Sequence, residues 1–218
     1  MVVVGRNRSR QCRARWRDIL VAVSIAVTAA LGAPAVITSA APAPAPAPTT
    51  PTAFDLSRYQ PVGAGQFRPV DYADNGRAFL RIGGWLCQIG PGYRYVGCQG
   101  HPPTAPPRVR GAAISGDQQG PWWVPDTSDY RFGAPSGFAP PTLPVGSRVT
   151  IAGVTCTAPG PGVAACRTGS RALIFTRAWH KFYFPAGDTA HSANPAPRYL
   201  PPSLRGSAQL PAQPQLPT

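Results

Sequence analysis

The sequence predicts an all-β fold, a small disulfide-stapled sandwich or open barrel with Pro-rich disordered flanks. Between residues 67 and 184 the apolar residues show no helical period. Short apolar runs alternate there with Gly and Pro, which is the pattern of short strands joined by turns. Two segments of this region, residues 87–98 and 156–166, each begin and end with a cysteine and hold a Pro-Gly pair between the two.

The cysteine spacing indicates two local disulfides in an oxidising compartment. A Pro-Gly pair suits a tight turn, because proline presets φ and glycine accepts a positive φ, so the flanking cysteines can sit on adjacent strands. Locality and the repeated pattern favour the pairs Cys87–Cys98 and Cys156–Cys166, while a crossed pairing that joins the two hairpins stays open. Zinc sites use cysteines two to four residues apart and these are about ten apart, so a metal site is not favoured. No cofactor is expected.

The apolar runs also place the strands. We expect them at residues 77–82, 85–89, 93–98, 108–114, 122–124, 148–151, 154–157, 163–167, 172–177 and 179–184. Side chains alternate between the two faces of a strand. Leu173, Phe175 and Trp179 share parity and are expected to face the core, with Val149 and Ile151 opposite them.

The first 40 residues have the plan of a secretory signal peptide. Six arginines and one aspartate precede an apolar run at residues 19–31, and small residues follow it. Cleavage is expected after Ala40, with Ala35 as the other option, and it would remove Cys12 and leave an even set of four cysteines. The alternative is an uncleaved membrane anchor, which is less favoured because a spanning helix needs roughly 20 apolar residues.

The composition divides the chain into four parts. These are a signal peptide at 1–40, an Ala/Pro-rich spacer and lead-in at 41–66, a two-disulfide β domain at 67–184 and a tail at 185–218. Alternating Ala and Pro in the spacer exclude both a helix and a strand ladder. The tail is rich in proline and poor in large apolar residues, so it is expected to be disordered.

The chain is strongly basic, with 21 Lys and Arg against 8 Asp and Glu and a net charge of +13. Beyond residue 40 the balance is 15 − 7 = +8. The arginines are scattered, and the one close pair, Arg108 and Arg110, would share a face of a strand. This charge indicates a solvated basic surface or attraction to anionic envelope components such as phosphorylated polymers and acidic lipids. Nucleic acid is not an expected partner, because export removes access to it.

Familiar catalytic motifs are missing from the sequence, among them Gly-x-Ser-x-Gly, Ser-x-x-Lys and Gly-x-Gly-x-x-Gly after a strand. The three histidines, including His180, are far apart and are interpreted as surface residues. The chain is therefore not expected to be an enzyme, and no catalytic residue is assigned. The alternative is an Asp-dependent envelope hydrolase that uses Asp117, Asp126 or Asp129.

Residues 118–130 carry one sharper hypothesis about binding. Trp122, Trp123 and Tyr130 lie there beside amide and acid side chains, including Asp126. Aromatic faces next to hydrogen-bonding groups suit sugar rings, which have an apolar face and many hydroxyls. These four residues are therefore the candidate ligand-binding residues. The alternative is that the two tryptophans alternate, one into the core and one onto a neighbouring loop.

One run of residues has the pattern of a family. A Leu-Pro-Val-Gly turn at 143–146 precedes a hairpin, Cys156 to Cys166 with an internal Gly-Val, and then a glycine and an apolar strand that ends in Thr-Arg. With the upstream Cys…Cys segment, residues 77–184 resemble an uncharacterised family of exported actinobacterial, mycobacterial-type proteins. The chain departs from the pattern at Gly-Ser-Arg, 169–171, where a Gly-His-Gly-like step is expected. The resemblance implies a disulfide-stapled β domain at the cell surface or in the wall, and adds no catalytic residue.

These features predict an exported cell-envelope protein that acts as a non-enzymatic binding or structural module. Its expected ligands are wall polysaccharide or anionic envelope components, and we expect it to be a monomer. A membrane would be contacted only through an uncleaved signal. The alternative from another class is a secreted module for a protein partner, such as an inhibitor, with the Pro-rich flanks as docking peptides.

Overall fold

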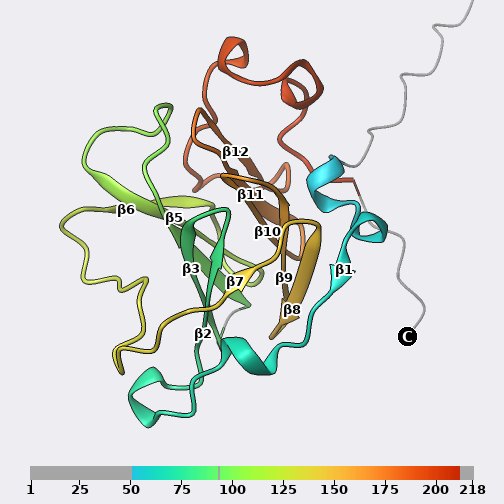
Figure 1. The fold of residues 1–218 in the computed structure, drawn as a ribbon. Helices are drawn as coiled ribbons and strands as arrows, with labels where there is room; N and C mark the ends of the chain where they lie inside the picture. Colours follow the sequence, from blue (N-terminus) through green and yellow to red (C-terminus); the bar gives the residue numbers. More distant parts are fainter. Residues whose placement is uncertain (1–50, 93, 212–218) are drawn as a thin grey trace, which may run out of the picture. The chain divides into compact units, whose positions relative to one another are not determined.

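The computed structural model describes residues 51–92 and 94–211, which form two six-stranded sheets packed as a sandwich (Figure 1). Sheet A contains, in spatial order, β1 (Gln60–Pro61), β8 (Ser147–Ile151), β9 (Val154–Gly160), β10 (Val163–Thr168), β11 (Arg171–Phe175) and β12 (His180–Tyr183). Sheet B contains β6 (Trp122–Pro125), β5 (Val109–Ser115), β4 (Tyr95–Gln99), β3 (Trp85–Gly90), β2 (Ala78–Ile82) and β7 (Thr142–Leu143). Short 3₁₀ helices flank the sheets: η1 (Thr52–Phe54), η2 (Leu56–Arg58), η3 (Gly65–Phe67), η4 (Tyr72–Asp74), η5 (Pro197–Tyr199) and η6 (Pro202–Leu204).

The chain runs up and down through each sheet, so the predicted all-β fold is confirmed, and of the two predicted forms, sandwich or open barrel, it is the sandwich. Strands β2 to β6 and β8 to β12 are joined as antiparallel neighbours. Every strand expected from an apolar run is present, with ends shifted by a few residues. The structure adds β1 and β7, which pair in parallel with β8 and β2. Each is two residues long, too short for any apolar pattern to reveal.

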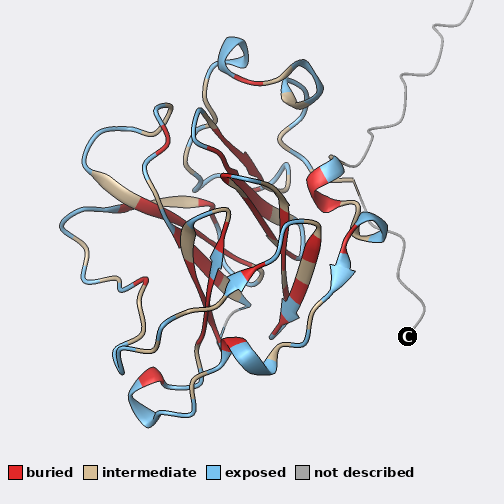
Figure 2. Cartoon of the chain, viewed as in Figure 1, coloured by how far each residue is buried: buried red, intermediate tan, exposed pale blue. Residues whose placement is uncertain are grey.

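The core lies between the sheets, where buried residues of both gather (Figure 2). Apolar side chains at alternate positions supply it, because one face of every strand points inward. Large side chains of this core include Phe67, Leu80, Ile82, Ile89, Ile114, Leu143, Leu173, Phe175 and Phe182. Figure 2 shows buried residues along the strands of both sheets and exposed residues mainly in the loops.

Both disulfides lie in this core. Cys87 is bonded to Cys98 across β3 and β4, and Cys156 to Cys166 across β9 and β10, which confirms the local pairing. The Sγ atoms of Cys87, Cys98 and Cys166 lie within 4.8 Å of one another, so the disulfide of one sheet lies against that of the other. All four sulfur atoms are in disulfide bonds, and this cluster therefore offers no thiolate to a metal ion.

The inward face of β12 differs from the sequence prediction. Leu173 and Phe175 lie in the core as expected, but Trp179 packs against a smaller cluster on the other face of sheet A. The turn between β11 and β12 pairs Phe175 directly with His180, and directly opposite residues share a face. His180 and Phe182 therefore point inward, and the expected parity of Trp179 is wrong.

Residues 185–211 pack on the sandwich, in contrast to the disordered tail expected for residues 185–218. The Asp188 side chain is fully buried, with Oδ2 2.7 Å from Nη2 of Arg171. The Asn194 amide accepts a hydrogen bond from the Phe182 backbone nitrogen at 2.6 Å and donates one to the Phe182 carbonyl oxygen at 3.0 Å. Polar side chains thus attach this segment to sheet A, together with Leu204 and Leu210, which pack on its outer face. The proline-rich composition of the segment gives no signal of these contacts.

Residues 52–66, expected as an irregular lead-in, also belong to the packed domain. Phe54 is buried on the outer face of sheet A, with its ring centroid 5.8 Å from that of Tyr183. The Thr157 hydroxyl donates a hydrogen bond to the Ala53 carbonyl oxygen at 2.7 Å. The described domain therefore begins before residue 67, because η1 and β1 both attach to sheet A.

Several sequence predictions fall on residues that the structure does not describe. These are the signal peptide at 1–40, the Ala-Pro run at 41–50 and the last residues of the tail, 212–218. Within the described part of the chain, no helix has the length and apolar character needed to cross a membrane. The two disulfides indicate an oxidising environment, extracellular or in the envelope.

Candidate functional site

The aromatic segment that the sequence singled out forms β6, at an edge of sheet B, and its two tryptophans point to opposite faces. Trp122 joins a cluster on the outer face, where its ring centroid lies 6.2 Å from that of Tyr95. Trp123 packs against the core, stacked at 5.9 Å on Phe175. The period of two in a strand imposes this alternation, and the two rings do not form a single platform.

The other two predicted ligand-binding residues also take separate positions. Tyr130 belongs to the outer cluster with Trp122, and a side chain at Gly97 would clash with its ring and hydroxyl. Asp126 is exposed, with Oδ2 3.8 Å from Nε of Arg108. The structure therefore brings Tyr130 and Trp122 together on the outer face, and pairs Asp126 with an arginine.

Trp123 lines an open pocket of about 350 Å³, which we call the Trp123 pocket. The other lining residues come from the loop between β4 and β5, from β12 and from the segment that follows β12. They are Thr104, Ala105, Pro106, His180, Ser192, Ala193, Asn194 and Pro195. The volume is at the lower end of the range for ligand pockets, and an apolar lining with a few polar groups is typical of them.

His180 is 1% exposed, so its expected place on the surface is wrong. Its Nδ1 lies 2.7 Å from the Thr104 hydroxyl oxygen, which also accepts a hydrogen bond from the His180 backbone nitrogen at 3.0 Å. That hydroxyl can therefore donate its proton to Nδ1, which leaves Nε2 protonated and directed at the Ala193 carbonyl oxygen, 3.4 Å away. Burial lowers the pKa of His180 to about 4, although the bond to Ala193 opposes the shift. The imidazole is thus neutral at pH 7.

The segment that walls the pocket bridges the edge strands of both sheets. Ser192 accepts a hydrogen bond from the Trp123 backbone nitrogen at 3.0 Å and donates its own backbone N–H to Pro121 on the β6 side. Asn194 is bonded to Phe182 on β12 at both ends of its amide. The Ser192 hydroxyl proton and the indole N–H of Trp123 have no acceptor among the residues that the structure describes. Both are available to a ligand.

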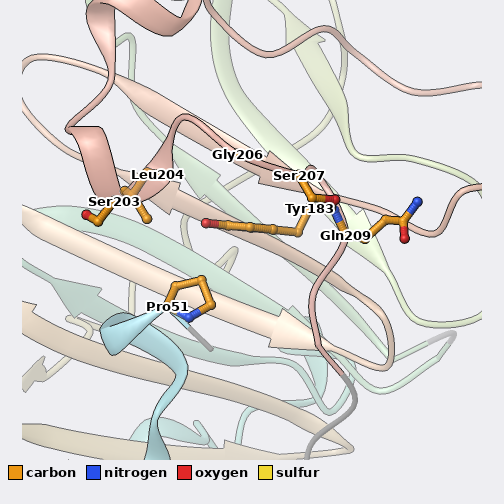
Figure 3. Close-up of a pocket in the computed structure, with 7 residues that line it drawn as sticks. All are labelled: Pro51, Tyr183, Ser203, Leu204, Gly206, Ser207 and Gln209. Atoms are coloured by element: carbon orange, nitrogen blue, oxygen red, sulfur yellow. Dashed lines mark hydrogen bonds between the residues drawn. The ribbon is translucent and has the colours of Figure 1, made fainter. Parts of the chain in front are cut away.

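A second pocket lies on the outer face of sheet A, and we call it the Tyr183 pocket (Figure 3). Its volume is about 170 Å³. It is lined by Pro51, Tyr183, Ser203, Leu204, Gly206, Ser207 and Gln209. Figure 3 shows the Tyr183 ring lying along the middle of this pocket, between the Ser203–Leu204 side and Gln209.

Lys181, the single lysine of the chain, lies beside the Tyr183 pocket and is 3% exposed. Its Nζ is 3.4 Å from the Gly206 carbonyl oxygen and 5.4 Å from the centroid of the Tyr183 ring. Burial disfavours the charged form of each group, so it lowers the pKa of Lys181 and raises the pKa of Tyr183. The Tyr183 pocket has little free volume beside this lysine, so it would admit only a small polar ligand.

The aspartates of the hydrolase alternative form different interactions. Asp117 accepts hydrogen bonds from the Arg94 guanidinium, with Nε at 3.0 Å, and these bonds hold the pKa of Asp117 below its usual value. Asp126 is paired with Arg108. Asp129 forms neither a hydrogen bond nor an ion pair within residues 51–92 and 94–211. Two of the three carboxylates are therefore paired with separate arginines.

Sequence reasoning found Trp123 and missed its polar neighbours. The sequence predicts a strand over residues 179–184. Had the pairing of Phe175 with His180 been predicted too, it would have placed the histidine on the inner face. Thr104 and Ser192 lie in irregular segments whose sequence carries no signal of their contacts. Comparison of the chain with protein-family models, with curated proteins and with solved structures finds no match.

Proposed function

We propose that this chain is an exported cell-envelope protein that binds a sugar unit of wall polysaccharide in the Trp123 pocket, without catalysing a reaction. The observation that carries the proposal is the combination of an aromatic ring with uncommitted hydrogen-bond donors in one open pocket. A sugar ring has an apolar face of C–H groups that packs on an aromatic side chain. Its hydroxyls accept hydrogen bonds of the kind that Trp123 and Ser192 have available.

The charge of the pocket favours a neutral ligand. None of its lining residues is an aspartate, glutamate, lysine or arginine, and His180 is neutral at pH 7 because of its burial. An anionic group would find no opposite charge there to offset its loss of hydration. A neutral hexose unit meets no such penalty.

The state of His180 also favours binding over catalysis. A general acid or base must exchange a proton with the substrate, and its pKa is best placed near the working pH. Both ring nitrogens of His180 already have partners in Thr104 and Ala193, and its pKa is about 4. The imidazole therefore serves as a rigid wall beside Trp123, with a ring-centroid distance of 4.7 Å.

The placement in the cell envelope is supported by features outside the pocket. Two disulfides indicate an oxidising compartment, and the first 40 residues have the composition of an export signal. The net charge of +8 beyond residue 40 would hold the protein near anionic wall polymers. The resemblance to exported actinobacterial proteins agrees with this location.

The test is co-sedimentation of the full-length protein with isolated cell-wall polysaccharide, at low and at high salt. Trp123→Phe keeps the stacking on Phe175 and removes the indole N–H, so we expect it to weaken binding about tenfold. The matched control is Trp122→Phe, the same change one residue away on the opposite face, which should leave binding unchanged. Both variants are first compared with the native protein by circular dichroism.

Two outcomes would overturn the proposal. Binding that disappears in high salt and is equal in both variants would reduce the interaction to charge attraction. Absence of binding at either salt concentration would exclude wall polysaccharide as the ligand. We expect binding that persists in high salt and that is weakened by Trp123→Phe but not by Trp122→Phe.

A further inference from the structure

Arg110 occupies a β-bulge that turns its side chain to the outer face of sheet B. The pairing of β5 with β6 shifts register between Val109 and Gly111, which leaves Arg110 as the extra residue. In a regular strand it would share the inner face with Ala112, which lies in the core. Its guanidinium carbon lies instead 5.7 Å from the ring centroid of Phe132, in the outer cluster. Bulges that redirect a side chain are frequent next to functional sites.

Main-chain carbonyl groups hold the guanidinium of Arg110 in place. Its Nη2 donates to the carbonyl oxygens of Ser128, at 2.6 Å, and of Tyr130. These neutral acceptors orient the cation and leave its charge unbalanced. The Nε atom is buried with no acceptor, and Nη1 remains accessible with no hydrogen bond to any described residue. The two N–H groups of Nη1, on a fixed cation, are therefore open to an acceptor from outside.

Three other arginines of the described domain are each paired with a carboxylate, and Arg110 is not. Arg94, Arg108 and Arg171 each form an ion pair with an aspartate. Arg110 forms none within the described residues. A fixed arginine without a counter-ion in the protein can bind the carboxylate or phosphate group of a ligand.

Arg110 lines an open pocket of about 370 Å³ with Gln99, Arg131, Phe132 and residues 133–135, which we call the Arg110 pocket. No lining residue is acidic, and the second cation, Arg131, is exposed. Gly111 permits the approach of the Phe132 ring, because a side chain there would clash with it and with the main chain. The pocket is therefore built around two cations and one aromatic wall.

We propose that the Arg110 pocket binds an oxyanion, namely the carboxylate or phosphate group of a small molecule or of a polymer unit. The Nη1 donors of Arg110 and the guanidinium of Arg131 would bind the oxyanion, since a guanidinium matches carboxylate and phosphate geometry. This site differs from the Trp123 pocket in residues and charge, so it is a second binding site that does not depend on the proposed function.

The experiment is an NMR titration of the full-length, ¹⁵N-labelled protein at constant ionic strength. The probes are inorganic phosphate, glucuronate as the carboxylate and glucose as the neutral control. We expect saturable shifts of the Arg110 and Arg131 side-chain signals with an anion and none with glucose. Saturation with phosphate alone assigns a phosphate ligand, and saturation with glucuronate alone assigns a carboxylate.

Arg131→Gln removes one of the two cations and should weaken anion binding by at least about tenfold. Arg68→Gln is the matched control, because Arg68 is exposed and does not line the pocket, and it removes the same charge. The absence of saturation with both anions, or equal weakening in the two variants, would overturn the proposal. Trp123→Phe should leave anion binding unchanged, so a failure here is distinguishable from a failure of the Trp123 pocket.

Discussion

Asp188 and Arg171 form an ion pair in which Oδ2 lies 2.7 Å from Nη2, and their side chains are 0% and 12% exposed. The same Oδ2 accepts a hydrogen bond from the Gly120 backbone nitrogen at 3.2 Å, and Nε of Arg171 donates to the Gly120 carbonyl oxygen at 3.2 Å. One ion pair thus joins β11, the loop before β6 and the segment after β12.

We expect Asp188→Ala to lower the free energy of unfolding by about 3–5 kcal/mol, because Arg171 would remain charged and unpaired in a largely buried site. The measurement is urea denaturation followed by tryptophan fluorescence. Asp126→Ala is the control, since Asp126 and Arg108 form a pair with side chains 48% and 79% exposed. An exposed pair contributes at most about 1 kcal/mol, so equal losses in the two variants would contradict the role given to burial.

Gly83 and Gly84, in the turn between β2 and β3, should respond differently to alanine. Both have a positive φ, 57° and 92°. A Cβ at Gly83 would lie 2.5 Å from the Val163 backbone nitrogen, whereas a Cβ at Gly84 has nothing within 4 Å. The turn between β2 and β3 therefore contacts the turn between β9 and β10. Trp85 Nε1 also donates a hydrogen bond to the Gly162 carbonyl oxygen at 3.0 Å.

Gly84→Ala therefore carries the cost of a left-handed alanine alone, about 1–2 kcal/mol. Gly83→Ala adds the displacement of a neighbouring main chain, and we expect a further loss of about 1–3 kcal/mol. Thermal and urea denaturation of the two variants measure the difference. Equal stability of the two variants would mean that the turns are free to separate.

The parts of the fold that sequence predicted are those with local signals. A Pro-Gly pair between two cysteines fixes a hairpin and its disulfide within about a dozen residues, and Cys87–Cys98 and Cys156–Cys166 follow from it. The attachment of residues 185–211 has no such signal. It involves Asp188 and Asn194, polar residues that in isolation are typical of a solvated loop, and isolated leucines such as Leu204 that pack on the outer face of sheet A.

The candidate site was also predicted only where the sequence carries a local signal. Trp123 stands out as a large aromatic residue beside polar ones, and it does line a pocket. The prediction of His180 on the surface is wrong, because the turn between β11 and β12 determines which residues of β12 point inward. That turn pairs His180 with Phe175, and the alternation within a single strand does not reveal this pairing. The sequence predicts Arg108 and Arg110 on the same face of one strand. In the structure Arg108 has a φ of 63° and precedes the strand.

The two disulfides are expected to contribute similar, non-additive stability. They close loops of 11 and 10 residues, so chain entropy assigns each about 3 kcal/mol. Cys87→Ala/Cys98→Ala and Cys156→Ala/Cys166→Ala should therefore lose comparable free energies of unfolding in non-reducing urea. The sulfur atoms of the two bridges lie against each other, so each change removes their mutual contact. The variant with all four changes should lose less than the sum, and strict additivity would show that the bridges do not interact.

His180 should make the protein less stable in mild acid. Its folded-state pKa is about 4, and an exposed histidine in the unfolded chain has a pKa of about 6.5. Between these values the unfolded chain binds a proton at this site and the folded protein does not, so the free energy of unfolding falls as the pH falls. Above pH 6.5 His180 causes no loss of stability. The loss grows as the pH falls from 6.5 to 4, and it does not grow further below pH 4. Its size is at most about 3 kcal/mol.

Urea denaturation between pH 4 and 7 measures this loss, and His180→Gln isolates it because the aspartates titrate in both proteins. We expect a shallower fall in stability for His180→Gln than for the native protein. His101→Gln, a change at an exposed histidine, should retain the native slope. An unchanged slope in His180→Gln would mean that the folded protein also protonates His180. The Trp123 pocket would then carry a charge in mild acid, and the preference for a neutral sugar would no longer hold there.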